Sequence, residues 1–417
     1  MDNKLSDWSN STLGEFVRLQ RGHDLPADQR NPGSVPVMGS GGQNGFHNKS
    51  LAKGPGVVIG RSGVGSMGRV SYCPVDYWPH NTVLYVTDFL GNDQRFVYYF
   101  LSQINLRGYD SGSAQASLNR NHVYSIQIHL PPLSEQRAIA HLLGTLDDKI
   151  ELNRRTNETL EEMARALFQS WFVDFDPVRA KAEGRSTGLP DAISDLFPDS
   201  FEEAELGEIP RGWRICCVND ICDWVSSGGT PARSRKDFWE NAEIPWFKTG
   251  ELNDGPLLDS AEKINDLALR SSSCKLWDAG TILFAIYASP TVGRIGVLTE
   301  RGTSNQAAAG LKAQDSVGTP FLRRTLLFSR DELQNIAVGA AQQNINVQIL
   351  KEHKIVAPGA ALMSLYSGMI SPLDDQQISL AKSTRELRSL RDTLLPKLIS
   401  GELRISEAEK LLEEAGV

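Results

Sequence analysis

The sequence predicts an α+β protein in which two mainly β domains are joined by two long helices, arranged as a pseudo-two-fold internal repeat. The segment Gly112–Asn119 matches Gly339–Asn346 at an offset of 227 residues, and Pro131 falls on Pro358 at the same offset. In each copy, short β-branched and aromatic runs alternate with glycine-rich turns, and a heptad pattern follows them. Such a period far exceeds that of solenoid repeats, so each copy is a whole domain followed by a helix.

The repeat divides the chain into five parts. We expect a first domain at 1–132, a first spacer helix at 133–175, a linker at 176–210, a second domain at 211–358, and a second spacer helix with a C-terminal tail at 359–417. Helices are also expected inside the domains, near Gln94–Gln103 and near Pro320–Leu333.

The first spacer helix follows Pro131-Pro132, with Ser134 as its expected N-cap and Glu135 in its first turn. Apolar residues at heptad spacing then predict a seam between the two spacer helices: Leu146, Ile150, Leu160 and Leu167 in the first, and Leu380, Leu387 and Leu394 in the second. Two-fold symmetry makes this intramolecular coiled coil antiparallel. Asn153 and Asn157 are expected to fix its register, and Pro396 is expected to bend or end the second helix.

Composition restricts the class of protein. Apolar residues make up 40% of the chain, no apolar run approaches the ~20 residues of a membrane helix, and no secretory signal opens the sequence. We therefore expect a cytoplasmic protein with no membrane contact, and five reduced cysteines without metal-site spacing.

The net charge of −8 lies mostly in the helical connectors, because residues 131–210 carry −9. The domains are close to neutral or slightly basic, with +2 over 1–130 and +1 over 211–357, which permits contact with DNA.

No catalytic motif of a methyltransferase, ATPase or metalloprotease occurs in the chain, and no nuclease cluster of carboxylates and lysine is recognisable. The pairs Asp147-Asp148 and Asp374-Asp375 are expected to open helices, where acidic residues stabilise the N-terminus. The two copies of the domain share no residue that could act as a catalytic acid, base or nucleophile. We therefore expect a binding module, with neither catalytic nor metal-binding residues.

The candidate DNA contacts are polar and cationic side chains near glycine-rich turns, each with a structural alternative. Glycines at 39–45 allow close approach to phosphates, and a plain surface loop is the structural alternative. Arginine reads guanine, and asparagine or glutamine reads adenine, but a solvated arginine or a helix-capping amide is the alternative in each case. The candidates are Ser40, Gln43, Asn44, Lys53, Arg61, Arg69, Gln115, Asn119, Lys248, Arg294, Gln342, Gln343 and Asn344. Of these, Lys53 and Lys248 fit phosphate contacts better than base contacts.

The order of these parts, with the segments Leu130–Gln136 and Leu395–Leu403, resembles the specificity subunit of Type I restriction-modification enzymes over nearly the whole chain. Family-like segments at 228–231 and 244–250 add Thr230 and Thr249 to the candidates. The motif at Pro131–Gln136 is not repeated at Pro358–Met363.

The resemblance implies that each domain is a target-recognition domain reading one half of a split sequence in double-stranded DNA. It also implies that the helices bind methyltransferase subunits and that a motor-nuclease subunit joins the complex. S-adenosylmethionine, ATP and magnesium would then belong to those partner subunits, and this chain would hold no cofactor.

The hypothesis is therefore a non-catalytic subunit that recognises a two-part DNA target. The 26 residues from Leu146 to Trp171 span about 39 Å as a helix, close to one turn of B-DNA at roughly 34–36 Å. The alternatives are an enzyme with unrecognised motifs and a structural coiled-coil adaptor that binds only proteins.

Overall fold

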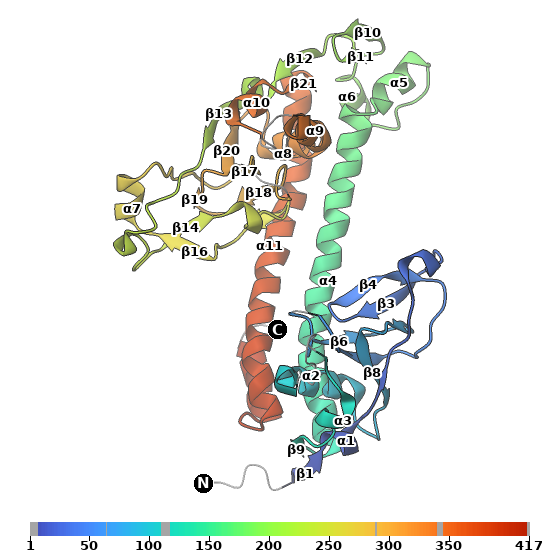
Figure 1. The fold of residues 1–417 in the computed structure, drawn as a ribbon. Helices are drawn as coiled ribbons and strands as arrows, with labels where there is room; N and C mark the ends of the chain where they lie inside the picture. The colour runs from blue at the N-terminus through green and yellow to red at the C-terminus, as the bar shows by residue number, and fades with distance from the viewer. Residues whose placement is uncertain (1–6, 64, 110–116, 288–289, 340–344, 415–417) are drawn as a thin grey trace. The chain divides into compact units, whose positions relative to one another are not determined.

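The computed structural model describes residues 7–63, 65–109, 117–287, 290–339 and 345–414, which divide into two compact units. Unit 1 comprises residues 1–151 and 385–417, and unit 2 comprises residues 152–384. Each unit holds one β-rich domain and part of both long helices, α4 (Leu133–Phe172) and α11 (Ala360–Ile399), which are labelled in Figure 1. The predicted α+β class with a duplicated domain is confirmed.

The β domain of unit 1 is built on two sheets with strand orders β2-β8-β5-β6 and β4-β3-β7. The strands are β2 (Arg18–Arg21), β3 (Val35–Gly39), β4 (Gly42–His47), β5 (Gly56–Gly60), β6 (Val70–Cys73), β7 (Trp78–Pro79) and β8 (Val83–Asp88). Every residue of β5 is buried, as expected for an apolar strand covered on both faces. One face packs on α2 (Gln94–Gln103), and the other packs on the smaller sheet.

The ends of this domain meet where α4 begins, because β1 pairs with β9 and Ser9 lies opposite Leu130. The remaining elements of unit 1 are β1 (Ser9–Thr12), α1 (Leu13–Phe16), α3 (Arg120–Val123), β9 (Gln127–Leu130), α12 (Ile405–Glu414) and short 3-10 turns at Ala27–Gln29 and Leu106–Tyr109.

Unit 2 repeats this plan with a larger sheet of order β13-β20-β17-β18-β15 and a smaller sheet of order β16-β14-β19. The strands are β13 (Cys222–Ser227), β14 (Ile244–Phe247), β15 (Pro256–Leu257), β16 (Glu262–Ile264), β17 (Ile282–Ala285), β18 (Ile295–Leu298), β19 (Thr303–Ser304) and β20 (Ala308–Ala313). Every residue of the central strand β17 is buried, like β5 of unit 1.

The remaining elements of unit 2 lie outside these two sheets. They are α5 (Asp176–Ala182), α6 (Asp191–Ser194), β10 (Phe201–Ala204), β11 (Gly207–Pro210), β12 (Arg214–Cys217), α7 (Asp266–Ser271), α8 (Thr319–Phe328), α9 (Arg330–Gly339), α10 (Val347–Glu352), β21 (Lys354–Ala357) and 3-10 turns at Val218–Ile221, Lys236–Phe238 and Thr249–Glu251. β12 pairs with β21 just as β1 pairs with β9.

The helix expected at Gln94–Gln103 is present as α2 with those bounds. The helix expected at Pro320–Leu333 is instead two helices, α8 and α9, because Ser329 ends the first. The break places Arg330 at the start of α9, where its guanidinium donates to the carboxylate of Asp254 at 2.6 and 3.0 Å.

The long helices run antiparallel in unit 2, as predicted. Asn153 donates to the hydroxyl of Ser383 at 3.2 Å, Gln377 donates to the carbonyl of Asn157 at 3.1 Å, and Tyr366 donates to the carbonyl of Ala164 at 2.9 Å. Residue numbers therefore rise along α4 as they fall along α11.

The predicted seam residues differ in how deeply they lie. In unit 1, Leu146 and Ile150 of α4 and Leu387 and Leu394 of α11 are buried in one cluster. In unit 2, three predicted positions are half-buried, namely Leu160, Leu167 and Leu380.

Two predictions about helix ends are wrong. The pairs at 147–148 and 374–375 do not open helices, because both lie deep inside α4 and α11. Ser134 is not the N-cap of α4, because the helix already begins at Leu133 and the Pro132 carbonyl accepts from the amides of Glu135 and Gln136. Pro396 lies within α11, which continues to Ile399.

The five cysteines are free thiols. Within the described ranges, no helix is long and apolar enough to cross a membrane. The same ranges contain no group of three or more His, Cys, Asp or Glu side chains that would hold a metal ion.

Candidate nucleic-acid interface

A polar cavity of about 790 Å³ opens on unit 1 between the end of β2, the residue after β5 and the start of α3. Its lining includes Arg21, His23, Asp24, Arg61, Ser117, Asn119 and Arg120. The structure thus brings together two residues predicted from the sequence, Arg61 and Asn119, with four cationic or titratable residues that were not predicted.

Positive charge dominates this cavity, because three arginines face one aspartate. Neither Arg21 nor Arg61 has a side-chain hydrogen bond or ion pair with the residues that the structure describes. Arg120 donates to the carbonyl of Leu19 at 3.2 Å, and Asp24 accepts from Asn81. Two guanidinium groups are therefore left to meet an anion or a base edge, the groups that arginine recognises in DNA.

Backbone bonds hold the walls of the cavity in place. The amide of Leu118 donates to the carbonyl of Arg61 at 2.9 Å, and the amide of Gly22 donates to the carbonyl of Val83 at 3.0 Å. A side chain at Gly22 would collide with the His80 carbonyl, so the chain passes there only because this residue lacks a Cβ. Strand pairing and close backbone packing thus hold the positions from which Arg21 and Arg61 emerge.

Asn119 caps a helix, which was its structural alternative. Its side chain accepts from the amide of Asn121 at 3.0 Å at the start of α3. The repeat-equivalent Asn346 accepts from the amide of Ile349 at 2.8 Å at the start of α10. The match between these two asparagines therefore reflects a shared fold. The side-chain oxygen of Asn119 is already occupied by the hydrogen bond that caps α3.

The equivalent place in unit 2 has different chemistry. The amide of Ile345 donates to the carbonyl of Ile286 at 2.9 Å, as Leu118 does to Arg61, so Ile286 occupies the position of Arg61. Ile286 is buried, whereas Arg61 lines an open cavity. The two domains share a scaffold but present unlike side chains at the same point.

In unit 2, a cationic cluster gathers around Glu262 instead. Lys248 donates to one oxygen of Glu262 at 2.6 Å, and Arg233 pairs with the other. Hydrogen bonds from Arg233 and Lys248 lower the pKa of Glu262. The guanidinium of Arg233 also lies over the rings of Trp239 and Trp246, at 4.0 and 4.7 Å from their centroids. Two cations share one carboxylate here, which leaves the cluster with a net positive charge.

The sequence reasoning missed Arg233, as well as Arg21 and Arg120. The only local signal for Arg233 was its position three residues after the Gly228–Thr230 turn, and its two tryptophan neighbours are brought in by the fold. Arg21 and Arg120 lie 99 residues apart in the sequence. No local pattern links them.

The glycine-rich segment at 39–45 forms a hairpin between β3 and β4. Ser40 donates to the carbonyl of Thr82 at 2.6 Å, while Gln43 and Asn44 are exposed on β4. Lys53 is exposed and pairs with Asp76 at 2.7 Å. Side chains of this hairpin are accessible, whereas Lys53, which follows the hairpin in the chain, is already paired.

The other predicted contacts are dispersed. Arg69 and Arg294 follow matched glycines with positive φ, Gly68 and Gly293, and neither guanidinium has a hydrogen bond or ion pair among the described residues. Thr230 bonds with Gln306, and Thr249 begins a 3-10 turn. The predicted contacts Gln115, Gln342, Gln343 and Asn344 lie outside the described residues.

A family model described as the Type I restriction modification DNA specificity domain matches residues 5–162 and 210–381. The Type I restriction enzyme HindI specificity subunit of Haemophilus influenzae is 28% identical, over 67% of this chain and 70% of its own length. The MjaIX specificity subunit of Methanocaldococcus jannaschii is 27% identical, over 75% of this chain and 69% of its own length.

A solved structure of similar fold is the S subunit of a Type-I restriction-modification system from M. genitalium. It is 16% identical, with a TM-score of 0.65, and the match covers 95% of this chain and 97% of that one. This likeness concerns the fold alone.

Proposed function

Because the chain belongs to the family of Type I restriction modification DNA specificity domains, we propose that it is the subunit that reads the DNA sequence in a Type I restriction-modification complex. The observation that carries the proposal is the presence of two such domains in one chain, at 5–162 and 210–381. One domain reads one half of a split target, and the second domain reads the other half.

The chemistry of the two domains supports two unlike half-sites. Unit 1 presents Arg21 and Arg61 in a polar cavity, whereas unit 2 has Ile286 at the place of Arg61 and presents Arg233 and Lys248 around Glu262. Arginines without an intramolecular ion pair suit guanine edges or phosphates, and a stacked, carboxylate-held arginine is already ordered before it meets DNA. The target is therefore asymmetric.

The long helices supply a surface for methyltransferase subunits. Leu152 and Met163 of α4 are 63% and 54% exposed. They lie 11 residues apart, which at about 3.6 residues per turn puts them on one face of the helix. Two exposed apolar side chains on one helix face are contacts that a partner helix could cover.

Catalysis belongs to the partner subunits in this proposal. The methyltransferase subunits bind S-adenosylmethionine, and a motor-nuclease subunit uses ATP and magnesium. The specificity chain contributes binding energy and orientation, and it holds no cofactor.

The proposal is tested by a methylome. Cells without DNA methylation of their own would express the chain together with the methyltransferase encoded by the neighbouring gene. Single-molecule sequencing would compare their DNA methylation with that of cells that lack this chain. We expect a gapped, two-part methylated motif that disappears when the chain is omitted. Unchanged methylation in its absence would instead favour a protein-binding adaptor.

A second assay separates reading from catalysis. The purified chain alone, supplied with S-adenosylmethionine or with magnesium, should neither methylate nor cut DNA that contains the motif. Activity without partners would contradict the assignment of catalysis to other subunits.

A further inference from the structure

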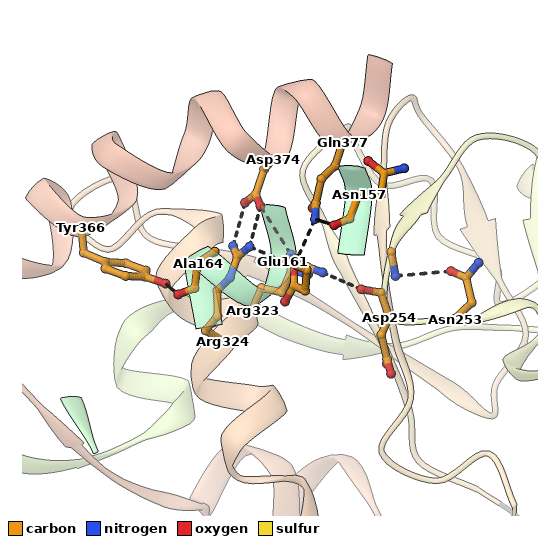
Figure 2. A network of polar contacts seen from close by, with 11 residues as sticks. Asn157, Glu161, Ala164, Asn253, Asp254, Arg323, Arg324, Tyr366, Asp374 and Gln377 are labelled. Atoms are coloured by element: carbon orange, nitrogen blue, oxygen red, sulfur yellow. Dashed lines mark hydrogen bonds and ion pairs between the residues drawn. The ribbon is translucent and has the colours of Figure 1, made fainter. Parts of the chain in front are cut away.

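A buried ionic cluster in unit 2 joins the recognition domain to both long helices. Arg324 of α8 donates two hydrogen bonds to the carboxylate of Asp374 on α11, at 2.6 and 2.8 Å, and a third to Glu161 of α4 at 3.2 Å. Its neighbour Arg323 contacts Glu161 at 2.9 Å and Asp374 at 3.4 Å. Figure 2 shows both guanidinium groups pointing toward the two carboxylates.

Further bonds extend this cluster in both directions. Arg323 donates to the carbonyl of Asp254 at 2.6 Å, which ties α8 to the loop before β15. Gln377 of α11 donates to the carbonyl of Asn157 at 3.1 Å and to Glu161 at 3.4 Å. The network therefore connects the β domain, α4 and α11 through continuous polar contacts (Figure 2).

Stability alone is a weak reason for such an arrangement. The side chains of Arg323 and Arg324 are 6% and 0% exposed, and the Nε atoms of both have no hydrogen-bond partner among the described residues. Burial disfavours the charge on Arg324, but bonding to Asp374 outweighs this and keeps its pKa raised. Buried ion clusters often contribute less to stability than well-packed apolar side chains would, whereas their directional bonds select one geometry.

Unit 1 builds the same joint with different chemistry. Asp147 matches Asp374 at the repeat offset of 227, and Tyr99 of α2 occupies the place of Arg324 at the offset of 225. Tyr99 donates to Asp147 at 2.6 Å, and Arg391 of α11 donates to the same carboxylate at 2.7 Å. In both units, an aspartate inside a long helix accepts hydrogen bonds from a helix of the β domain. Asp147 also accepts from Arg391 on the antiparallel helix, whereas in unit 2 the arginines bonded to Asp374 reach Glu161 on that helix.

We propose that Asp147 and Asp374 are positioning residues, each of which locks its recognition domain into one orientation on the long helices and thereby fixes the gap between the two half-sites. This inference rests on the proposed function, because a gap exists only in a two-part target. The aspartates do not touch DNA. They act through the helices that carry the domains.

The test uses the full chain in complex with its methyltransferase subunits. Methylation rates are measured on duplexes whose gap is correct, or is longer or shorter by one or two base pairs, and the preference for the correct gap is the ratio of rates. For Asp374→Asn we expect this preference to fall about tenfold, equivalent to a loss of about 1.4 kcal/mol. The bases preferred within each half-site should not change.

Two further variants show whether a change in gap preference comes from the hydrogen bonds to Asp374. Arg324→Tyr installs the residue that unit 1 uses, keeps a donor for Asp374, and should retain more of the gap preference than Asp374→Asn does. Asp237→Asn breaks an exposed pair with Arg235 in the same unit and should leave the preference unchanged. If Asp374→Asn yields no folded complex, Asp147→Asn, which removes the matching carboxylate of unit 1, is measured instead and should lower the gap preference in the same way.

A folded Asp374→Asn complex with unchanged gap preference would overturn the inference. So would an equal loss of rate at every gap, which would indicate that the cluster only stabilises the fold. A wild-type complex that shows no gapped preference would contradict the proposed function instead, so the two failures are distinguishable.

Discussion

The guanidinium of Arg61 is the predicted DNA contact whose surroundings best suit that role. It lines the cavity of unit 1 with Arg21 and Arg120, and it has no ion-pair partner among the described residues. Lys53, another predicted contact in the same unit, already pairs with Asp76. A free guanidinium gives up no intramolecular bond when it meets DNA, whereas a paired lysine exchanges one partner for another.

We expect Arg61→Gln to weaken specific DNA binding by about 1–3 kcal/mol if Arg61 makes a bidentate base contact, and to relax base preference at one position. The matched variant Lys53→Gln should weaken binding by less, about 0–1 kcal/mol, because that lysine is exposed and already paired. Dissociation constants of the full complex on target DNA at fixed salt measure both effects. Equal losses for the two variants would argue against a special role for the cavity.

His353 gives a prediction about stability at different pH values. It is buried at the end of α10, and burial lowers its pKa, although Glu332 at 3.8 Å opposes the shift. The unfolded chain therefore binds a proton at His353 more readily than the folded chain does. The stability contributed by the neutral imidazole is complete above the unfolded pKa of about 6.5 and is lost as the pH falls through the lower folded pKa.

Unfolding by urea at pH values between 7.5 and 5.5 checks this prediction. The free energy of unfolding should fall less steeply with acidification in His353→Gln than in wild type, whatever the offset between the two curves. A steeper slope for His353→Gln would mean that the folded state favours the protonated imidazole.

At the scale of elements, α4 and α11 pair antiparallel, so a change in the length of one helix must be matched in the other. Asn153 bonds with Ser383, and Gln377 bonds with Asn157, so the two helices are in fixed register in unit 2. A heptad inserted in α4 alone would shift every contact on one side of the insertion. Length is therefore a property of the pair.

We expect one heptad inserted between Glu151 and Ala164, together with a matching heptad inserted in α11 before Arg385, to lengthen the recognised gap. Seven helical residues add about 10 Å, which corresponds to about three base pairs at roughly 3.4 Å each. Methylome sequencing gives the new gap directly, and both half-sites should keep their bases. A lengthened helix pair that still reads the original gap would show that the helices do not act as a ruler.

At the scale of the whole molecule, the two recognition domains belong to separate compact units, and their cationic sites share no residue. Arg61→Gln should therefore change base preference in one half-site only, and Arg233→Gln in the other. Free energies of binding for the double variant should equal the sum of the single effects within about 0.5 kcal/mol, the tolerance usual for independent sites. Relaxed preference in both halves after either single change would contradict independent reading.

The sequence by itself determined the duplicated α+β plan and the two long helices, because hydrophobic periodicity and repetition can be recognised along the chain. The antiparallel pairing followed from the two-fold symmetry that the repeat implies. The sequence also located α2 to the residue. The prediction that the aspartate pairs open helices was wrong. Acidic residues near an expected helix start suggested a dipole effect, but the true partners of Asp374 lie about 50 residues away, on α8.

Only the tertiary structure decided which polar residues act together. Arg21, Arg61 and Arg120 meet because strand pairing brings three distant segments to one cavity. The anchoring of each domain on its long helices, at Asp147 and Asp374, likewise depends on packing between elements. Local patterns follow from backbone geometry, whereas these contacts depend on how the strands and helices associate, which the spacing of residues along the chain does not encode.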